Sequence, residues 1–400
     1  MSQRGNKNGG GGVKTLGLNG DSAVAYAMKQ INPDVVAGYP ITPQTIAIER
    51  FSEYVADGEV DTEFVATESE HSAMSACIGA SAAGGRVMTS TASAGLALMW
   101  EMLYVAAGMR LPIVMNVMNR ALSAPLNIHC DHSDSMGARD SGWIQIHGEN
   151  VQEAYDNIIQ AVKIAEEARI PVMPCFDGFI VSHAVERFDA LDDDVVKKFL
   201  GKYVPLYSLL NVKSPVTMGP ADLPDFYMEH KKQQHEAMKN ALDIVKQVGN
   251  EYKEISGRGY DSLEPYKLSD AEIGIVVIGS TSGTVRDTVD IMREKGIKVG
   301  SLKLRLFRPF PRLDIMNALK SLKVIAVMDK SDSFGSFGGP LFVEVRNALF
   351  KNSNAEIVNY IYGLGGRDVK ITDIETVFND LLEISKTNKI NEYVNYLGVR

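Results

Sequence analysis

Short apolar runs alternate with Ala- and Gly-rich stretches along residues 13–190, and this alternation restricts the fold more than any other feature of the chain. The apolar runs predict buried strands at 35–37, 64–66, 87–89, 112–117 and 172–176. The stretches between them predict helices at 20–30, 43–57, 71–84, 94–109 and 151–168. Strands and helices in alternation form parallel sheets with helices on both faces. The pattern returns after residue 270, so we predict an α/β protein with two parallel-sheet domains.

Length and composition limit the possible functions. A chain of 400 residues exceeds what one hydrophobic core usually supports. The net charge of −9 argues against a nucleic-acid surface, and no apolar run is long enough to span a membrane. Cys77, Cys130 and Cys175 are far apart, which argues against an iron–sulfur cluster or metal site within this chain. Three unpaired thiols fit a reducing cytoplasm.

Composition also suggests where the domains begin and end. Residues 1–12 are rich in Gly and Asn and are expected to be a disordered tail. We expect a first domain at 13–255 that ends in a linker with a surface helix at 191–255, where prolines precede a polar helical stretch. A second domain is expected at 256–385, and a C-terminal tail at 386–400.

The first motif is Tyr39-Pro40-Ile41-Thr42-Pro43, directly after a predicted strand. Its prolines fix φ and disfavour helix in the residues before them, so the segment is expected to form a rigid extended turn. Ligands of parallel α/β proteins bind at the carboxyl ends of strands, where this turn lies. A proline-rich strand exit without any ligand is the structural alternative.

The second motif is Glu68-Ser69-Glu70-His71, between a strand and an Ala-rich helix. Acidic residues at a helix start interact favourably with the helix dipole, and capping alone would explain them. The functional alternative is a buried carboxylate against a cofactor nitrogen. A thiamine cofactor requires such a carboxylate beside N1′ of its aminopyrimidine ring.

The third motif is Asn119-Arg120-Ala121-Leu122-Ser123-Ala124-Pro125, which follows an apolar strand. The Arg120 guanidinium could bind a substrate carboxylate with two parallel hydrogen bonds, or it could simply be solvated. Residues 121–129 are too apolar for an ordinary surface loop. Asp131-His132-Ser133-Asp134 lacks a further cluster of ligands, so we do not predict a metal there.

Three glycine-rich segments follow, at 279–283, 335–339 and 363–366. The segment at 279–283 lacks the Lys of a phosphate-binding loop and the third glycine of a dinucleotide-binding fingerprint. All three are therefore expected to be tight turns, and an NAD-linked dehydrogenase is disfavoured.

In this order, the motifs resemble the α subunits of the multi-subunit 2-oxoacid:ferredoxin oxidoreductases, most closely those of the pyruvate enzymes. The resemblance extends over nearly the whole chain. Besides the three motifs it includes Asp131-His132-Ser133-Asp134, Arg139-Asp140-Ser141-Gly142-Trp143, Phe176-Asp177-Gly178-Phe179, Arg308-Pro309-Phe310-Pro311 and Gly363-Leu364-Gly365-Gly366-Arg367-Asp368.

The resemblance implies a thiamine diphosphate pyrimidine-binding domain followed by a domain like the C-terminal domain of transketolase. Glu70 would be the carboxylate beside N1′, and Pro40 would line the pocket. Thr42 and Arg120 would hold the substrate carboxylate, and Glu68 would cap the helix.

The implied reaction is the oxidative decarboxylation of pyruvate with coenzyme A, or its reverse, with electrons passing to an external ferredoxin. The chain has no Gly-Asp-Gly signature for the cofactor diphosphate and no cluster cysteines. The diphosphate and Mg²⁺ would therefore be held by a β subunit, and the [4Fe–4S] clusters by partner subunits that include ferredoxin-like γ and δ chains. A 2-oxoisovalerate or other 2-oxoacid enzyme, and a non-catalytic α/β scaffold, are the alternatives. Thr42 and His132-Ser133 favour pyruvate.

Overall fold

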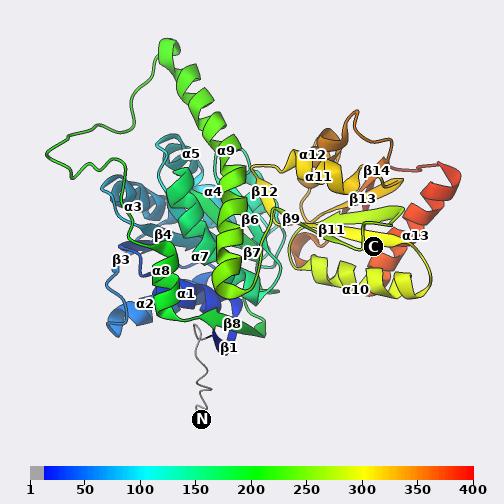
Figure 1. Ribbon diagram of the computed structural model, residues 1–400, viewed down its shortest axis with the longest axis horizontal. Coiled ribbons are helices and arrows are strands. Elements are labelled where there is room, and N and C mark those ends of the chain that lie inside the picture. Colours follow the sequence, from blue (N-terminus) through cyan, green and yellow to red (C-terminus); the bar gives the residue numbers. More distant parts are fainter. Residues whose placement is uncertain (1–12) are drawn as a thin grey trace, which may run out of the picture.

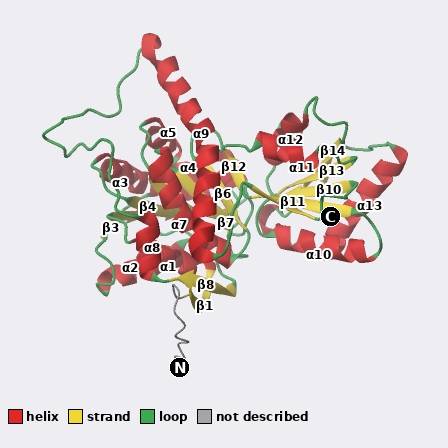
Figure 2. Ribbon diagram, viewed as in Figure 1, coloured by secondary structure: helices red, strands yellow, loops and turns green. Residues whose placement is uncertain are grey.

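Two sheets dominated by parallel strands organise the chain, and each has helices on both of its faces (Figures 1 and 2). The computed structural model describes residues 13–400, so the tail expected at 1–12 lies outside the described residues. The larger, N-terminal body runs from blue to green in Figure 1, and the smaller, C-terminal body runs from yellow to red. The predicted fold class is confirmed.

The first sheet has the strand order β12-β6-β7-β5-β4-β2-β3, and every neighbouring pair except β12 with β6 is parallel. Its strands are β2 (Val35–Gly38), β3 (Glu63–Ala66), β4 (Val87–Thr91), β5 (Ile113–Asn119), β6 (Ile144–Gly148), β7 (Val172–Asp177) and β12 (Leu306–Arg308). The central strands are buried throughout, which explains why they read as continuous apolar runs.

Side chains of β5 alternate between the two faces of this sheet: Val114 and Met118 enter one core, whereas Met115 and Val117 enter the other. The first core is covered by α1 (Gly20–Ile31), α2 (Thr45–Ala56), α7 (Val151–Ala168) and part of α9 (Pro224–Ser256). The second is covered by α3 (Glu70–Ala82), α4 (Ser93–Leu98) and α5 (Trp100–Gly108). The sheet is therefore the middle of three layers.

The connection between the two bodies is only partly the surface linker that we expected. It contains β8 (Val185–Leu191), which pairs with β1 (Val13–Asn19), then α8 (Asp193–Leu200), an extended segment at 201–223 and α9. The N-terminal half of α9 projects from the body in Figure 1. Its C-terminal half packs against α7 and buries Val245, Val248 and Tyr252 completely, because this half carries an apolar stripe.

The second sheet has the strand order β15-β14-β13-β10-β11-β9, with only β9 antiparallel to its neighbour. Its strands are β9 (Leu263–Tyr266), β10 (Ile273–Val277), β11 (Val299–Leu304), β13 (Val324–Asp329), β14 (Glu356–Ile361) and β15 (Val394–Tyr396). One face is covered by α11 (Arg312–Leu319) and α12 (Pro340–Leu349), and the other by α10 (Thr281–Glu294) and α13 (Ile371–Thr387).

Several elements differ from their predicted form. The helix expected at 94–109 is divided at Met99 into α4 and α5. The segment 386–400, expected to be a tail, contributes β15, which is parallel to β14. The short strand β12 comes from the expected second domain but joins the first sheet. A contact between the two bodies is thus part of the hydrogen-bonded sheet itself.

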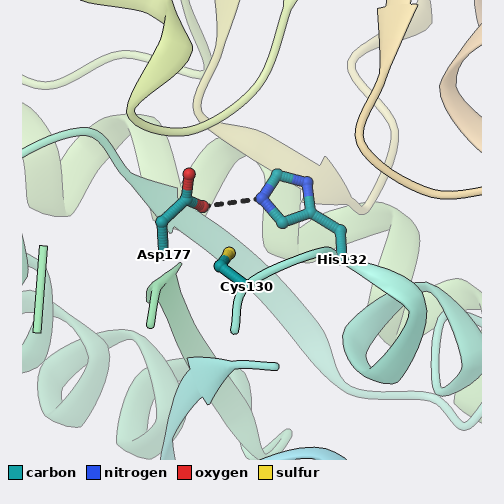
Figure 3. Close-up of side chains that lie close together, drawn as sticks. All are labelled: Cys130, His132 and Asp177. Carbon is teal, nitrogen blue, oxygen red and sulfur yellow. Dashed lines mark hydrogen bonds and ion pairs between the residues drawn. The ribbon is translucent and has the colours of Figure 1, made fainter. Parts of the chain in front are cut away.

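The Asp177 carboxylate at the end of β7 is a second junction between the two bodies. Its Oδ1 lies 2.7 Å from Nε2 of His132 (Figure 3). Its Oδ2 accepts hydrogen bonds from Nζ of Lys330 at 2.9 Å and from Oγ of Ser280. Burial raises the pKa of Asp177, but Lys330 and His132 outweigh it and hold that pKa well below its usual range. The carboxylate is therefore charged and paired within a buried interface.

Replacing Lys330 by Met should reduce the free energy of unfolding by about 3–5 kcal/mol, because a buried carboxylate loses its counter-charge. Lys323→Met is the matched control, since Lys323 forms a solvent-exposed ion pair with Glu272 in the same domain. That variant should lose less than about 1 kcal/mol. Urea unfolding of both variants checks this prediction, and equal losses would contradict it.

Within residues 13–400, no helix combines the length and the apolarity that crossing a membrane requires.

Candidate functional site

The predicted site residues lie on three segments that leave the first sheet at the same edge. Pro40 and Thr42 follow β2, Glu70 follows β3 and Arg120 follows β5. Because these strands are parallel, their carboxyl ends meet at one edge. The topology therefore gathers the three sequence motifs at the place where this fold class binds ligands.

Glu70 is the first residue of α3, and Ser69 is the N-cap whose hydroxyl accepts a hydrogen bond from the Ser72 N–H at 3.2 Å. The Glu70 side chain is buried, with 6% of the residue exposed. A Cβ atom at Gly95 of α4 would lie 2.6 Å from Glu70 Oε1 and equally close to Thr91 Oγ1. Only glycine at position 95 leaves room for this carboxylate, and we find no hydrogen-bond donor to it within residues 13–400.

Glu68, two residues earlier, has a different environment. Its side chain is exposed and accepts a hydrogen bond from the Ser72 hydroxyl, which lowers the pKa of Glu68. The resemblance gave Glu68 the capping role, but the N-cap itself is Ser69. Burial thus separates the two acids of the motif, and only Glu70 is withdrawn from solvent.

The turn after β2 is held by a residue that sequence reasoning missed. Gln44 is fully buried, and its Nε2 donates hydrogen bonds to the carbonyl oxygen of Ser90 at 2.7 Å and to that of Tyr39 at 3.3 Å. The turn is thereby attached to β4, while Pro40 and Thr42 remain exposed at its surface. Apart from its place directly after the Tyr39–Pro43 motif, nothing in the sequence indicates this role for Gln44.

Arg120 is buried, with 8% of the residue exposed, and its guanidinium reaches the same turn. Its Nη1 donates to the Thr42 carbonyl oxygen at 2.9 Å, and its Nε donates to the Asn127 carbonyl oxygen at 2.9 Å. Within residues 13–400, no carboxylate forms an ion pair with it. A buried cation that lacks a counter-charge is costly, so this position favours an anionic ligand.

The buried Asp134 carboxylate connects the Arg120 segment with α4. Its Oδ2 accepts hydrogen bonds from the backbone N–H groups of Arg120 and Ser93, both at 2.9 Å, and its Oδ1 accepts one from the Asn119 amide at 2.8 Å. Burial raises the pKa of Asp134 to about 6, although these hydrogen bonds favour the ionised form. Ser93 begins α4, which also carries Gly95, so Asp134 fixes the surroundings of both Glu70 and Arg120. The 131–134 motif was noticed in the sequence, but this role was not foreseen.

Two clusters of possible metal ligands each already contain a lysine ammonium group. Cys130, His132 and Asp177 lie together (Figure 3), but Lys330 donates a hydrogen bond to the Asp177 carboxylate. The second cluster, Glu149, Glu153 and Glu264, surrounds Nζ of Lys303. The lysines supply the positive charge that a cation would bring, so we read both clusters as ion-pair networks between the two bodies.

Comparison with known families agrees with this arrangement. Residues 26–250 match the family described as pyruvate flavodoxin/ferredoxin oxidoreductase, thiamine diphosphate-binding. Residues 271–374 match the pyruvate:ferredoxin oxidoreductase core domain II. The two matched ranges together include every predicted site residue, the whole first sheet, and the second sheet except its two outermost strands, β9 and β15.

Curated relatives are similar over almost their full length. The chain is 51% identical to pyruvate synthase subunit PorA of Thermotoga maritima over 97% of this chain and 99% of that protein. It is 50% identical to PorA of Methanocaldococcus jannaschii, over 90% and 93% of the two chains. It is 42% identical to ketoisovalerate oxidoreductase subunit VorA of Pyrococcus abyssi, over 96% of this chain and 97% of that protein.

Solved structures show the same fold at low sequence identity. A 2-oxoglutarate:ferredoxin oxidoreductase from Magnetococcus marinus superposes with a TM-score of 0.70 at 19% identity, and the match covers 93% of this chain and 65% of that one. A split-gene transketolase superposes with a TM-score of 0.56 at 11% identity, over 92% and 100%. The family matches and the curated relatives place the chain in the pyruvate flavodoxin/ferredoxin oxidoreductase family, as an α subunit of the 2-oxoacid:ferredoxin oxidoreductases.

Proposed function

We propose that this chain is the α subunit of a pyruvate synthase, or pyruvate:ferredoxin oxidoreductase, which works only together with partner subunits. In the proposed reaction, pyruvate loses carbon dioxide and two electrons, and the thiol of coenzyme A takes the acetyl group and releases a proton. Two one-electron ferredoxin acceptors receive the electrons, and the reverse reaction uses the same groups. The observation that carries the proposal is that two buried charged groups, the Glu70 carboxylate and the Arg120 guanidinium, lie at one edge of the sheet. Neither has a counter-charge within residues 13–400.

The residues at this edge fit the pyrimidine end of thiamine diphosphate. The Glu70 carboxylate is buried beside glycine, and the nearby Thr91 Oγ1 is buried without a hydrogen-bond partner in the described chain. Glu70 would hold the ring nitrogen N1′ in its protonated form, and Pro40 would line the pocket. When bound, the cofactor supplies the electron sink for decarboxylation. Residues 13–255 would thus form the pyrimidine-binding domain, and 256–385 the domain like the transketolase C-terminal domain.

Arg120 and Thr42 would bind the 2-oxoacid carboxylate. The Arg120 Nη2 has no hydrogen-bond partner within residues 13–400 and is free to donate to an anion. Thr42, whose backbone carbonyl oxygen accepts the hydrogen bond from Arg120 Nη1, is exposed on the same turn. Holding the carboxylate on one side would direct the reacting carbonyl group toward the cofactor, which lowers the entropic part of the barrier.

We further propose that partner subunits complete the site. A β subunit would hold the diphosphate and Mg²⁺, and γ and δ subunits would carry the [4Fe–4S] clusters that lead to ferredoxin, with the assembly in the cytoplasm. Apolar side chains are exposed on the segments around the site, among them Tyr39, Leu98 and Trp100. Exposed apolar groups of this size support burial against another chain.

Pyruvate is favoured as the substrate by the higher identity to the PorA relatives, although the VorA relative keeps 2-oxoisovalerate as an alternative. Pockets that differ by a few methylene groups discriminate only modestly, so both acids could be used. A non-catalytic scaffold is disfavoured, because it would bury Glu70 and Arg120 at a cost in stability without a compensating ligand.

The proposed activity is tested by isolating the chain with its native partners and recording the visible spectrum. Pyruvate together with coenzyme A should bleach the broad absorbance of oxidised iron–sulfur clusters in the anaerobic complex. A colourless preparation that contains no thiamine would contradict the proposal. Bleaching by 2-oxoisovalerate but not by pyruvate, each added with coenzyme A, would establish the alternative substrate.

Glu70→Gln should slow proton exchange at thiamine C2 by about 10²-fold or more, because an amide cannot supply the negative charge. Glu68→Gln is the control, since its carboxylate is exposed only two residues away, and it should exchange at the wild-type rate. NMR after quenched deuterium exchange measures both rates. An unchanged rate in Glu70→Gln would remove Glu70 from cofactor activation.

Arg120→Lys should raise KM for pyruvate by about 10-fold or more, because an ammonium group cannot make the bidentate contact. Arg110→Lys is a suitable control, since Arg110 also donates to two backbone carbonyl groups but precedes β5 at the opposite edge of the sheet. Steady-state kinetics of the complex compare the two variants. Equal effects on KM would argue against a substrate role for Arg120.

A further inference from the structure

The loop behind Arg120, residues 121–133, lies against a glycine turn of the C-terminal body. We propose that this turn, Gly365-Gly366, positions Arg120 for the substrate carboxylate through Asn127, so that the second domain takes part in substrate binding without touching the substrate. The inference rests on the proposed function, because it assigns Arg120 the role of substrate clamp.

Asn127 is the link between the turn and the guanidinium. Its side-chain Nδ2 donates a hydrogen bond to the Gly365 carbonyl oxygen at 2.9 Å. Its own backbone carbonyl oxygen accepts the hydrogen bond from Arg120 Nε at 2.9 Å. One residue therefore receives its position from the second domain and transmits that position to the Arg120 head group.

Further hydrogen bonds form within the loop and between its C-terminal end and the turn. The Gly365 N–H donates to Asp131 Oδ2 at 3.1 Å, and Asp131 Oδ1 accepts the Ser133 N–H at 3.0 Å. At the base of the loop, the Ala121 N–H donates to the His129 carbonyl oxygen at 3.0 Å. These hydrogen bonds hold the loop at its base and at its end next to the second domain.

Glycine is required in the turn for two separate reasons. Gly365 and Gly366 have φ of +62° and +80°, where a side chain is strained. In addition, a Cβ atom at Gly365 would collide with the Asn127 amide, and one at Gly366 would collide with the Cβ of His129. The two glycines therefore allow the backbone of one domain to approach the loop of the other, which is a stronger requirement than that of a tight turn alone.

One further contact between the two bodies lies in this loop, the hydrogen bond from the His132 N–H to the Lys330 carbonyl oxygen at 2.7 Å, and it is at the end of the loop, five residues beyond Asn127. Other contacts between the bodies lie outside the loop. Lys303 is paired with glutamates on and next to α7, and β12 joins the far edge of the first sheet at β6. Disturbing the Gly365 turn should therefore move the loop while leaving those contacts in place. This separation makes the inference testable in the assembled protein.

The test compares Gly365→Ala and Asn127→Ala with Gly296→Ala in the complex isolated with its native partners. Gly296 has φ of +79° in the same domain, but a Cβ atom there would meet nothing within 4 Å. It reproduces the backbone strain without the collision. Hydrogen exchange, read by mass spectrometry, should be faster at the Ala121 and His129 amides in Gly365→Ala and Asn127→Ala, and unchanged in Gly296→Ala.

In steady-state kinetics, Gly365→Ala and Asn127→Ala should raise KM for pyruvate by about 10-fold, because the clamp loses its position, while kcat changes by less than about 3-fold. KM for coenzyme A and proton exchange at thiamine C2 should stay at wild-type values, since Glu70 lies on a different segment. If these substitutions only destabilised the protein, they would lower the fraction of active enzyme, and hence kcat, and leave KM for pyruvate unchanged.

The outcomes separate this inference from the proposed function. Unchanged loop exchange, or faster exchange with an unchanged KM for pyruvate, overturns the inference while the proposed function stands. A wild-type complex that uses a different 2-oxoacid overturns the pyruvate assignment, and the same KM comparison with that acid decides the inference. If the wild-type complex turns over no 2-oxoacid, the proposed function and the inferred role of the turn both fail.

Discussion

The paired charge of Asp177 and Lys330 is the interaction on which the relation between the two bodies depends. The carboxylate ends a central strand of the first sheet, and the ammonium group follows a strand of the second. Such a pair is favourable in a buried interface only when its geometry is well defined, so it specifies one arrangement of the bodies rather than merely favouring association. The backbone N–H of His132 also donates to the Lys330 carbonyl oxygen at 2.7 Å, which carries the same constraint into the loop behind Arg120.

The candidate site is built from residues that have distinct tasks. Glu70 and Arg120 are the groups for which no hydrogen-bonded counter-charge is found in the described chain, whereas Gln44 and Asp134 are the groups whose hydrogen bonds place them. In the proposed site, the groups without a counter-charge would contact the ligands, and the hydrogen-bonded groups would support the segments that carry them. A mutation of a supporting residue should therefore resemble a weaker form of a mutation in the site.

Much of the architecture could be predicted because central parallel strands are apolar along their whole length, and residues 113–117 of β5 are an example. Strand β6 escaped prediction because Gln145 and His147 look polar, yet both are fully buried, and the Gln145 amide donates to the Ser135 carbonyl oxygen at 2.7 Å. The short β12 depends on a partner about 160 residues away, which no local pattern reveals. The site motifs were visible in the sequence, but the supporting roles of Gln44 and Asp134 arise only from tertiary hydrogen bonds.

The uncompensated charge of Arg120 has a consequence for the chemical selection of substrates. A thiamine enzyme could in principle react with any small carbonyl compound, including aldehydes that have no carboxylate. An aldehyde would leave the buried guanidinium without an anion and would have to displace solvent from it, whereas a 2-oxoacid satisfies it. The clamp would thus act as a filter for acids against neutral carbonyl compounds, set by the cost of leaving a charge unmatched rather than by the shape of the pocket.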